Sequence, residues 1–581
     1  MSEEIKSFGV LDKFRNDVAA QLATITGASA EAILPAVEEC KKKELGDFSV
    51  NAARLMRLVP GAPKGKPVDF AAQWVAAFKP SALLEAATTA GPYMNFSCST
   101  TELAKAVCAS VTKFGEKYGT SNEGAGKKVI VEYSSPNIAK PFHAGHLRST
   151  ILGNFLVTTH KAGGFDVIGI NWLGDWGVQF GKLAVGFEKW GNEEALQKEA
   201  LRHLYEVYVK VNAACNEDKV LDKEAHEFFR KMEDGEEASL KVWNRFRDLS
   251  ISDLNKTYKR LNIAFDVISG ESHMNHEIED EALATLKEKG LLREDQGATI
   301  VPLKEVSKLP NAILRKSDDT TLYLTRDIAA AIERYREFHF EKMFYVVSAQ
   351  QSLHFEQLFK TLELMGHDWA KKCVHVPFGM VKGMSTRKGT AVFLDDILNE
   401  ARSTMLEVMS KNTGKIDELD EDPEKVADVV GVSAVVVQDF NARRIKDYDF
   451  QWARMTSFEG HTGPYLQYAH ARLCSVERKC GFPLNPAADV TLLKEKEAHI
   501  LLMEIARFPE VIRQAREALE PITLVSYLYD LAHAISVAHS ALWVKGREQD
   551  LADARLMLYH VARVTLGNGL RIIGLTPLER M

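Results

Sequence analysis

Two histidines stand three residues apart where a helical pattern begins. His143 and His146 occur in the run His-Ala-Gly-His, after a loop that contains Pro136 and Pro141. At this spacing both side chains lie on one face of a helix, near the positive end of its dipole. That position suits phosphate, and imidazole donors there could hold a triphosphate while charge develops on it. An isolated pair of this kind is more commonly a solvated pair or a partial metal site, so the surrounding sequence must decide.

The element before the histidines reads as a buried strand. Residues 128–133 form a short apolar run rich in β-branched side chains, which is typical of a strand in a parallel sheet. A polar, Gly-rich break over 121–126 precedes it, and we place a domain boundary there. Strand, loop and helix then follow in order, with their polar residues gathered at the carboxyl end of the strand. Open α/β sheets bind ligands at that edge.

The rest of this region alternates in the same way. Residues 166–172 predict a second strand, 321–325 predict a third with a helix after it, and 344–347 repeat the strand signal. Between them, residues 186–310 are highly charged and mostly helical, and we interpret them as inserted segments. The alternation predicts an α/β fold, a Rossmann-like doubly wound parallel sheet.

Different patterns flank this sheet. Residues 1–125 read as mixed α+β and close with a Gly-Pro turn and a strand. Residues 456–581 are nearly all helical and predict an all-α domain. The division that we expect is therefore 1–125, 126–455 and 456–581.

Composition excludes several classes of protein. The chain has 581 residues, 46% of them hydrophobic and 26% charged, which argues against fibrous and disordered proteins. Its net charge of −7 argues only mildly against a nucleic-acid partner, because a basic face can exist on an acidic whole. The charged start of the chain and the lack of a long apolar run indicate a cytoplasmic protein with no membrane span. Seven widely spaced cysteines favour reduced thiols over disulfides or zinc.

The histidine run lies in a longer block that matches a known family. Residues 134–149 closely resemble the HIGH region of arginyl-tRNA synthetases, which are class I enzymes, and the eukaryotic-type branch fits best. Further blocks follow in the family's order, at 171–181, 323–327, 348–354, 378–381, 459–469 and 577–581. The resemblance implies an arginine–tRNA ligase with a class I catalytic domain between an N-terminal domain that contacts the tRNA D-loop and a C-terminal anticodon-binding domain. Such an enzyme activates L-arginine with ATP to arginyl-adenylate and transfers it to the 3′ end of tRNA(Arg), releasing AMP and pyrophosphate. We expect a monomer.

The resemblance assigns side chains to the arginine substrate. A planar guanidinium with five donors is selected by carboxylates placed for forked contacts. Glu132 and Asp327 match the family's acids, and Tyr323 matches its aromatic wall; an alternative for Asp327 is that it only stabilises a helix start. Contacts to the amino and carboxylate ends are implied for Ser135, Asn137, His146 and Gln351, with Gln350 as the neighbouring alternative to Gln351.

ATP is expected across the carboxyl end of the sheet, with Mg²⁺ on its phosphates and without protein-bound zinc. The matching positions for ATP binding are His143, Gly145, His146, Met380 and Met384.

The second class I signature, KMSKS, departs from the family pattern. It would fall at 383–389, where Gly383 replaces the first lysine and Thr386 the second. Arg387 or Lys388 could reach the leaving phosphates, and Lys140 could supply the missing charge. Our hypothesis is that Lys140 carries most of it, so the expected catalytic set is His143, His146, Lys140, Arg387 and Lys388. The alternative is that the basic loop is only solvated.

Aromatic residues and an arginine recur on one face of the C-terminal helical region. Tyr465, Tyr468 and Arg472 have the spacing i, i+3, i+7, which suits a platform for unstacked bases but equally a core stripe. The resemblance favours tRNA contacts, and it adds Trp543 and Met581 on the anticodon side. In the N-terminal domain it adds Tyr93 and Asn95, beside the D-loop.

Two rival functions remain open at this point. One is a paralogue that keeps the fold and binds tRNA without catalysis, although the intact candidate site residues speak against it. The other is a different class I synthetase, such as the cysteine or leucine enzyme, which would not need paired acids.

Overall fold

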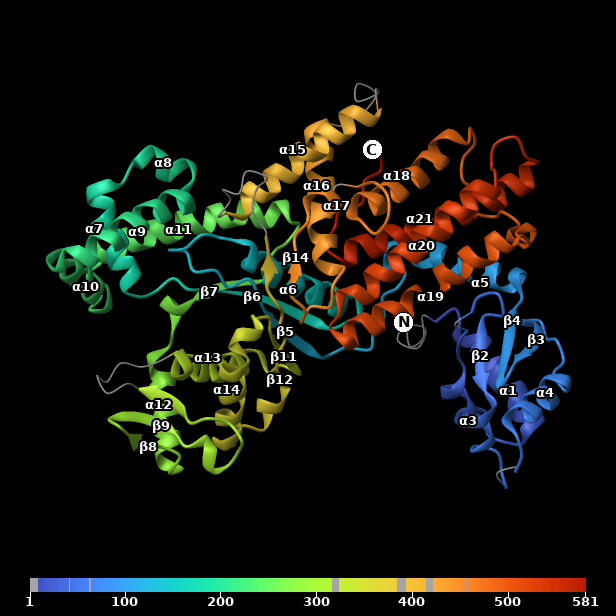
Figure 1. Cartoon of the computed structure of the whole chain (residues 1–581), viewed down its shortest axis with the longest axis horizontal. Coiled ribbons are helices and arrows are strands. Elements are labelled where there is room, and N and C mark those ends of the chain that lie inside the picture. Colours follow the sequence, from blue (N-terminus) through green and yellow to red (C-terminus); the bar gives the residue numbers. More distant parts are fainter. Residues whose placement is uncertain are drawn as a thin grey trace.

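The computed structural model describes residues 9–40, 42–61, 64–315, 323–383, 393–413, 422–455 and 457–581. Figure 1 shows an N-terminal unit in blue, a central sheet with helices around it, and a helical C-terminal unit in orange and red. The predicted fold class is confirmed by this arrangement.

The N-terminal unit is built on an antiparallel sheet in the order β1-β2-β4-β3. Gly91, with φ of 59°, forms the turn between β3 and β4, as the Gly-Pro pattern predicts. The elements are α1 (Asp12–Thr26), α2 (Ala30–Ile33), β1 (Glu38–Glu39), β2 (Phe48–Asn51), α3 (Ala52–Met56), α4 (Pro67–Ala76), β3 (Leu84–Ala90), β4 (Tyr93–Cys98) and α5 (Thr100–Phe114).

The central sheet is parallel throughout and has the order β12-β11-β5-β6-β7. Its strands are β5 (Lys128–Glu132), β6 (Asp166–Leu173), β7 (Val267–Gly270), β11 (Lys342–Tyr345) and β12 (Cys373–His375). Three successive apolar residues of β5, at 129–131, are fully buried, because helices cover both faces of the sheet. The strand order reverses between β5 and β11, so the carboxyl ends of these two strands form the crevice in which such sheets bind ligands.

The prediction of a strand over residues 321–325 is wrong. Residues 321 and 322 lie outside the described residues, and Tyr323 begins α13 (Tyr323–Phe338). Leu324 and Ile328 are buried one turn apart, and the hydroxyl of Thr325 donates to the carbonyl of Leu314 at 2.9 Å. A helical period therefore overrides the short β-branched signal. Asp327 consequently lies in the second turn of a helix and not at the end of a strand.

The segment that we interpreted as inserted also contributes to the central sheet. It includes the end of α7 (Val178–Trp190) and all of α8 (Glu193–Lys198), α9 (Ala200–Glu217), α10 (Lys219–Glu233), α11 (Glu237–Arg260) and α12 (His276–Glu288). Its strand β7, however, pairs with β6, so residues 186–310 are not wholly an insertion. Four residues are too few to give a strand signal within a charged helical stretch. A separate antiparallel sheet follows, with β8 (Arg293–Asp295), β9 (Ala298–Val301) and β10 (Ala312–Arg315).

Helices dominate the remaining chain. After α14 (Ser352–Leu364) come α15 (Leu394–Thr413), α16 (Pro423–Phe440), α17 (Trp452–Met455), α18 (Gly463–Lys479), α19 (Lys496–Ala518), α20 (Pro521–Ala541) and α21 (Gln549–Ile572). One short parallel pair, β13 (Val381–Lys382) with β14 (Tyr448–Asp449), joins two distant segments of the catalytic region. None of the helices that the structure describes combines the length and apolar character needed to cross a membrane.

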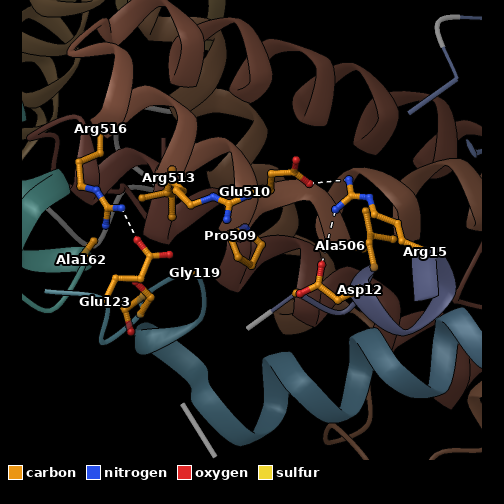
Figure 2. Close-up of a pocket in the computed structure, with 16 residues that line it drawn as sticks. Asp12, Arg15, Gly119, Glu123, Ala162, Ala506, Pro509, Glu510, Arg513 and Arg516 are labelled. Atoms are coloured by element: carbon orange, nitrogen blue, oxygen red, sulfur yellow. Dashed lines mark hydrogen bonds and ion pairs between the residues drawn. The ribbon is translucent and has the colours of Figure 1, made fainter. Parts of the chain in front are cut away.

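Helix α19 contacts both other units. Figure 2 shows its Glu510 bonded to Arg15 of α1, at 2.5 Å, and its Arg516 bonded to Glu123, which precedes β5. A cavity of about 100 Å³ lies between these two ion pairs. Near the N-terminal end of α19, His499 lies 2.9 Å from the carboxylate of Asp47. The N-terminal unit is therefore attached to the rest of the molecule partly through α19, and its helix α5 also packs against α21.

Candidate active site

The loop after β5 has an unusual backbone. Ser134 and Ser135 have φ values of 71° and 45°, in the left-handed region, which costs a non-glycine residue roughly 1–2 kcal/mol. Buried hydrogen bonds hold this conformation: the Ser134 amide donates to the Ser149 hydroxyl at 3.0 Å, and the Ser135 amide donates to the Asn171 side chain at 3.1 Å. The buried hydroxyl of Ser135 has no hydrogen-bond partner among the described residues. Its hydrogen-bonding capacity is therefore not satisfied within the described part of the protein.

The two histidines cap helix α6 (Ala144–Ala162), as predicted. The Gly145 amide donates to Nδ1 of His143 at 3.1 Å, and the His143 amide donates to Nδ1 of His146 at 3.2 Å. Because Nδ1 accepts in both rings, the proton of each neutral imidazole lies on Nε2. The cap thus leaves two Nε2–H donors at a helix N-terminus.

Both imidazoles are neutral at physiological pH. Burial, together with smaller effects of the neighbouring His143 and Lys140, lowers the pKa of His146 to about 3. Burial also lowers the pKa of His143, again with a contribution from Lys140. The histidines can therefore donate hydrogen bonds to phosphate but carry no positive charge. Lys140, which is exposed, lies close enough to both rings to act on them electrostatically.

The two predicted acids, Glu132 and Asp327, lie close enough to interact electrostatically. Glu132 ends β5 and is buried, whereas the side chain of Asp327 on α13 keeps 39% of its surface exposed. Burial raises the pKa of Glu132, Arg334 lowers it, and the charge of Asp327 raises it again. Each acid already has a partner: Arg334 for Glu132 at 2.6 Å and His354 for Asp327 at 2.5 Å. The sequence reasoning found the acids but missed both partners.

The other predicted substrate contacts lie around the same edge. The side chain of Asn137 accepts from the Ala139 amide at 3.0 Å, which leaves its amide group for other contacts. Tyr323 is 68% exposed at the start of α13, and Gln351 is exposed just before α14. The side chain of Gln350 contacts the sulfur of Met380 at 3.4 Å, so Gln351 is the freer of the two glutamines.

Arg148 connects the histidine helix to the base of the KMSKS-like loop. Its guanidinium donates to the carbonyls of Gly379 and Lys446, at 2.7 and 2.9 Å, and pairs with Asp439 at 3.2 Å. Arg148 and Asp439 are both 1% exposed, and the ring of Tyr448 lies 5.2 Å from the guanidinium. Met380 and β13 follow Gly379 directly. The predicted residues Met384, Arg387 and Lys388 lie outside the described residues.

The candidate tRNA contacts of the C-terminal unit differ in exposure and surroundings. Tyr468 and Trp543 are exposed, and Arg472 donates to His539 at 2.9 Å beside a cavity of about 500 Å³. Tyr465 is half-buried and packs against the core, so the alternative of a core stripe describes it in part. The terminal Met581 packs against an apolar cluster that includes Met405 and Met409.

In the N-terminal unit, the two predicted contacts differ. Tyr93 is 47% exposed, but Asn95 is only 2% exposed, because the chain around Cys40 covers it. This burial counts against the tRNA contact that the resemblance implies for the Asn95 side chain. Alternation along a strand gives the face of a residue, and it does not reveal whether a loop covers that face.

Three family models match successive parts of the chain. They are the arginyl tRNA synthetase N terminal domain over residues 12–98, the catalytic domain of class I tRNA synthetases (R) over 109–452, and the DALR anticodon binding domain over 466–581. The chain is 48% identical to the probable cytoplasmic arginine–tRNA ligase of Dictyostelium discoideum, over 98% of this chain and 100% of that protein. The chain belongs to the arginyl-tRNA synthetase family.

Other arginyl-tRNA synthetases agree with this assignment. The cytoplasmic arginine–tRNA ligase of Saccharomyces cerevisiae is also 48% identical, over 98% of this chain and 95% of its own. The structure of the Thermus thermophilus arginyl-tRNA synthetase superposes with a TM-score of 0.79 at 23% identity, covering 98% of this chain and all of that one, and so shares the fold. The predicted family and architecture of an arginyl-tRNA synthetase are thereby confirmed.

Proposed function

We propose that this protein is an arginine–tRNA ligase, which uses ATP to activate L-arginine and transfers the arginyl group to the 3′ end of tRNA(Arg). One observation carries the proposal. Two acids that interact electrostatically lie at the carboxyl edge of the sheet, next to a helix start that presents two imidazole donors and Lys140. A cationic amino acid and a polyphosphate fit the two halves of this site.

In the first step, the carboxylate of arginine attacks the α-phosphate of ATP in line, and pyrophosphate leaves. Glu132 and Asp327 hold the guanidinium, Tyr323 lies beside it, and Ser135, Asn137 and Gln351 hold the amino and carboxylate ends. The Nε2–H groups of His143 and His146 donate to the phosphates. This chemistry consists of positioning and charge stabilisation, and it needs no protein nucleophile.

Mg²⁺ enters this proposal as part of the ATP substrate. Within the part of the chain that the structure describes, no group of three or more His, Cys, Asp or Glu side chains is arranged to hold a metal ion. The triphosphate itself supplies the oxygen ligands that Mg²⁺ prefers.

In the second step, the terminal ribose of tRNA takes the arginyl group at its 2′-hydroxyl, and AMP leaves. Tyr465, Tyr468, Arg472, Trp543 and Met581 contact the anticodon side in this proposal. Of the N-terminal candidates we retain Tyr93 beside the D-loop and omit Asn95, which is buried.

The protein is proposed to act as a monomer in the cytoplasm. Its relatives include both cytoplasmic and mitochondrial arginine–tRNA ligases, among them the mitochondrial ligase of Saccharomyces cerevisiae at 43% identity. Sedimentation of the purified protein and imaging of a C-terminally tagged protein in cells test these two points.

The test of the activity is ATP–pyrophosphate exchange with arginine, with and without tRNA. We expect exchange that depends on arginine, and charging of tRNA(Arg) in the same preparation. Protein that binds tRNA but is silent in exchange under both conditions would instead be a binding paralogue. Exchange with cysteine or leucine in place of arginine would indicate another class I specificity.

Trp543→Ala is expected to weaken tRNA binding without altering arginine activation. Trp543 is 63% exposed beside the cavity of the C-terminal unit, and stacking of one base on an aromatic ring contributes about 1–3 kcal/mol. The KM for tRNA should rise roughly 5- to 150-fold. Val537→Ala, an exposed change on α20 away from this cavity, is the control. Equal values of KM for tRNA in both variants would exclude Trp543 from the interface.

A further inference from the structure

A second guanidinium, part of the protein itself, lies beside the arginine site. Arg334 of α13 is 7% exposed, and its NH1 lies 2.6 Å from Oε2 of Glu132. The guanidinium also lies over the ring of Trp172, at 4.6 Å, and near that of Tyr345, at 5.9 Å. Oε2 of Glu132 is fully covered, so the exposed tenth of this side chain belongs to its other atoms. The ion pair thus occupies one side of the carboxylate only.

We propose that Arg334 is a positioning residue of the arginine site: it fixes the orientation of the Glu132 carboxylate and neutralises one of the two acids. This inference rests on the proposed function, in which Glu132 and Asp327 bind the substrate guanidinium. Two carboxylates and one internal guanidinium leave one net negative charge. That charge matches the single positive charge of an arginine side chain.

The surroundings of Glu132 explain why it needs an internal partner. Burial raises its pKa, and Asp327 from α13 acts in the same direction, while Arg334 opposes both. Tyr345 of β11 and Cys373 of β12 also face this cluster. Burial raises the pKa of the Tyr345 phenol and of the Cys373 thiol above their ordinary ranges. His354 of α14 lies 2.5 Å from the carboxylate of Asp327. Arg334 is therefore the cation within this cluster that faces Glu132 directly, among the described residues.

A purely structural role predicts a different behaviour. If the ion pair only joined α13 to β5, its loss would destabilise the protein, and arginine binding would show no new dependence on pH. If Arg334 positions and neutralises Glu132, its loss raises the pKa of Glu132 and so increases the protonated fraction of this carboxyl. A protonated Glu132 lacks the negative charge that attracts the substrate guanidinium, so arginine binding weakens, and it recovers as the pH rises.

The test is Arg334→Gln, which keeps a hydrogen-bond donor for Glu132 but removes the charge. The KM for arginine in pyrophosphate exchange is compared with wild type between about pH 6.5 and pH 8.5. We expect the KM of the variant to be about tenfold that of wild type at the lower pH, because a rise of one unit in the pKa of Glu132 changes its ionisation equilibrium tenfold. At the higher pH the ratio of the two KM values should be smaller. Arg334→Lys, which restores a charge, should return the ratio towards one. Arg336→Gln, an exposed change on the same helix, is the control.

Each outcome decides the proposal. An unchanged or lower KM for arginine in Arg334→Gln, or a ratio that does not vary with pH, overturns it. If Arg334→Gln does not fold, Trp172→Leu removes the ring beneath the guanidinium and should raise the KM in the same pH-dependent way. An unchanged KM there overturns the proposal as well. Wild-type protein without arginine-dependent exchange would instead refute the proposed function, before any variant is compared.

Discussion

Lys140→Ala is expected to slow arginine-dependent pyrophosphate exchange by about 10²- to 10³-fold, the loss typical of removing one group that stabilises transition-state charge. Both capping histidines are neutral, so they can orient the phosphates but cannot neutralise them. The lysines of the usual KMSKS signature are replaced by Gly383 and Thr386. Lys140 lies within electrostatic reach of both imidazoles and therefore of any phosphate that they bind. The variant should show this reduced rate of exchange even at saturating arginine.

Two further lysines make this prediction specific. Lys382 is paired with Asp447 at 3.3 Å, so Lys382→Ala should change exchange little and serves as the control. Lys388 is the competing candidate for the missing charge. If Lys140→Ala leaves exchange unchanged while Lys388→Ala abolishes it, the assignment of this role to Lys140 is wrong.

Arg148→Met is expected to lower the free energy of unfolding by about 3–5 kcal/mol, because it leaves the buried carboxylate of Asp439 without its partner. Burial already raises the pKa of Asp439, and Arg148 opposes that rise. In the variant the pKa of this carboxyl rises further. A carboxyl whose pKa is raised on folding destabilises the fold increasingly as the pH rises above its pKa in the unfolded chain, so the loss should be larger at pH 7 than at pH 5.

Urea unfolding followed by tryptophan fluorescence at both pH values measures this effect. The double variant Arg148→Met/Asp439→Leu removes both charges and should recover most of the loss. Arg402→Met, on α15 with a long and exposed ion pair to Glu424, is the control. If the double variant is as unstable as the single one, the carbonyl contacts of Arg148, and not its charge pairing, hold this part of the protein together.

The sequence predicted the parts of the site that depend on local order. Strand β5, the capped start of α6 and strand β6 are adjacent in the chain, and each has a clear period or cap. The prediction was wrong where a signal was short: β7 has four residues, and the start of α13 has a β-branched residue that packs as part of a helix.

Buried cations could not be found in this way. Arg148 and Arg334 each occur in a helix, where an isolated arginine usually marks a solvated face. Their partners lie about 200 or more residues away in the sequence, at Glu132 and Asp439, and only the fold brings them together. The same limit explains Asn95, whose exposed or covered state depends on a loop about 55 residues earlier in the chain.

The attachment of the N-terminal unit to α19 has a consequence for synthesis on the ribosome. Arg15 and Glu510 are separated by 495 residues, so α1 emerges long before its docking partner exists. At typical elongation rates of about 5–20 residues per second, that interval is roughly 25–100 s. During this time the first unit must keep its docking face, which includes Asp47 and Arg15, exposed without aggregating. Arg15 and Asp47 keep part of that face polar, whereas apolar side chains such as Tyr118, which stacks on Phe508 of α19, lack their cover until the C-terminal helices are made.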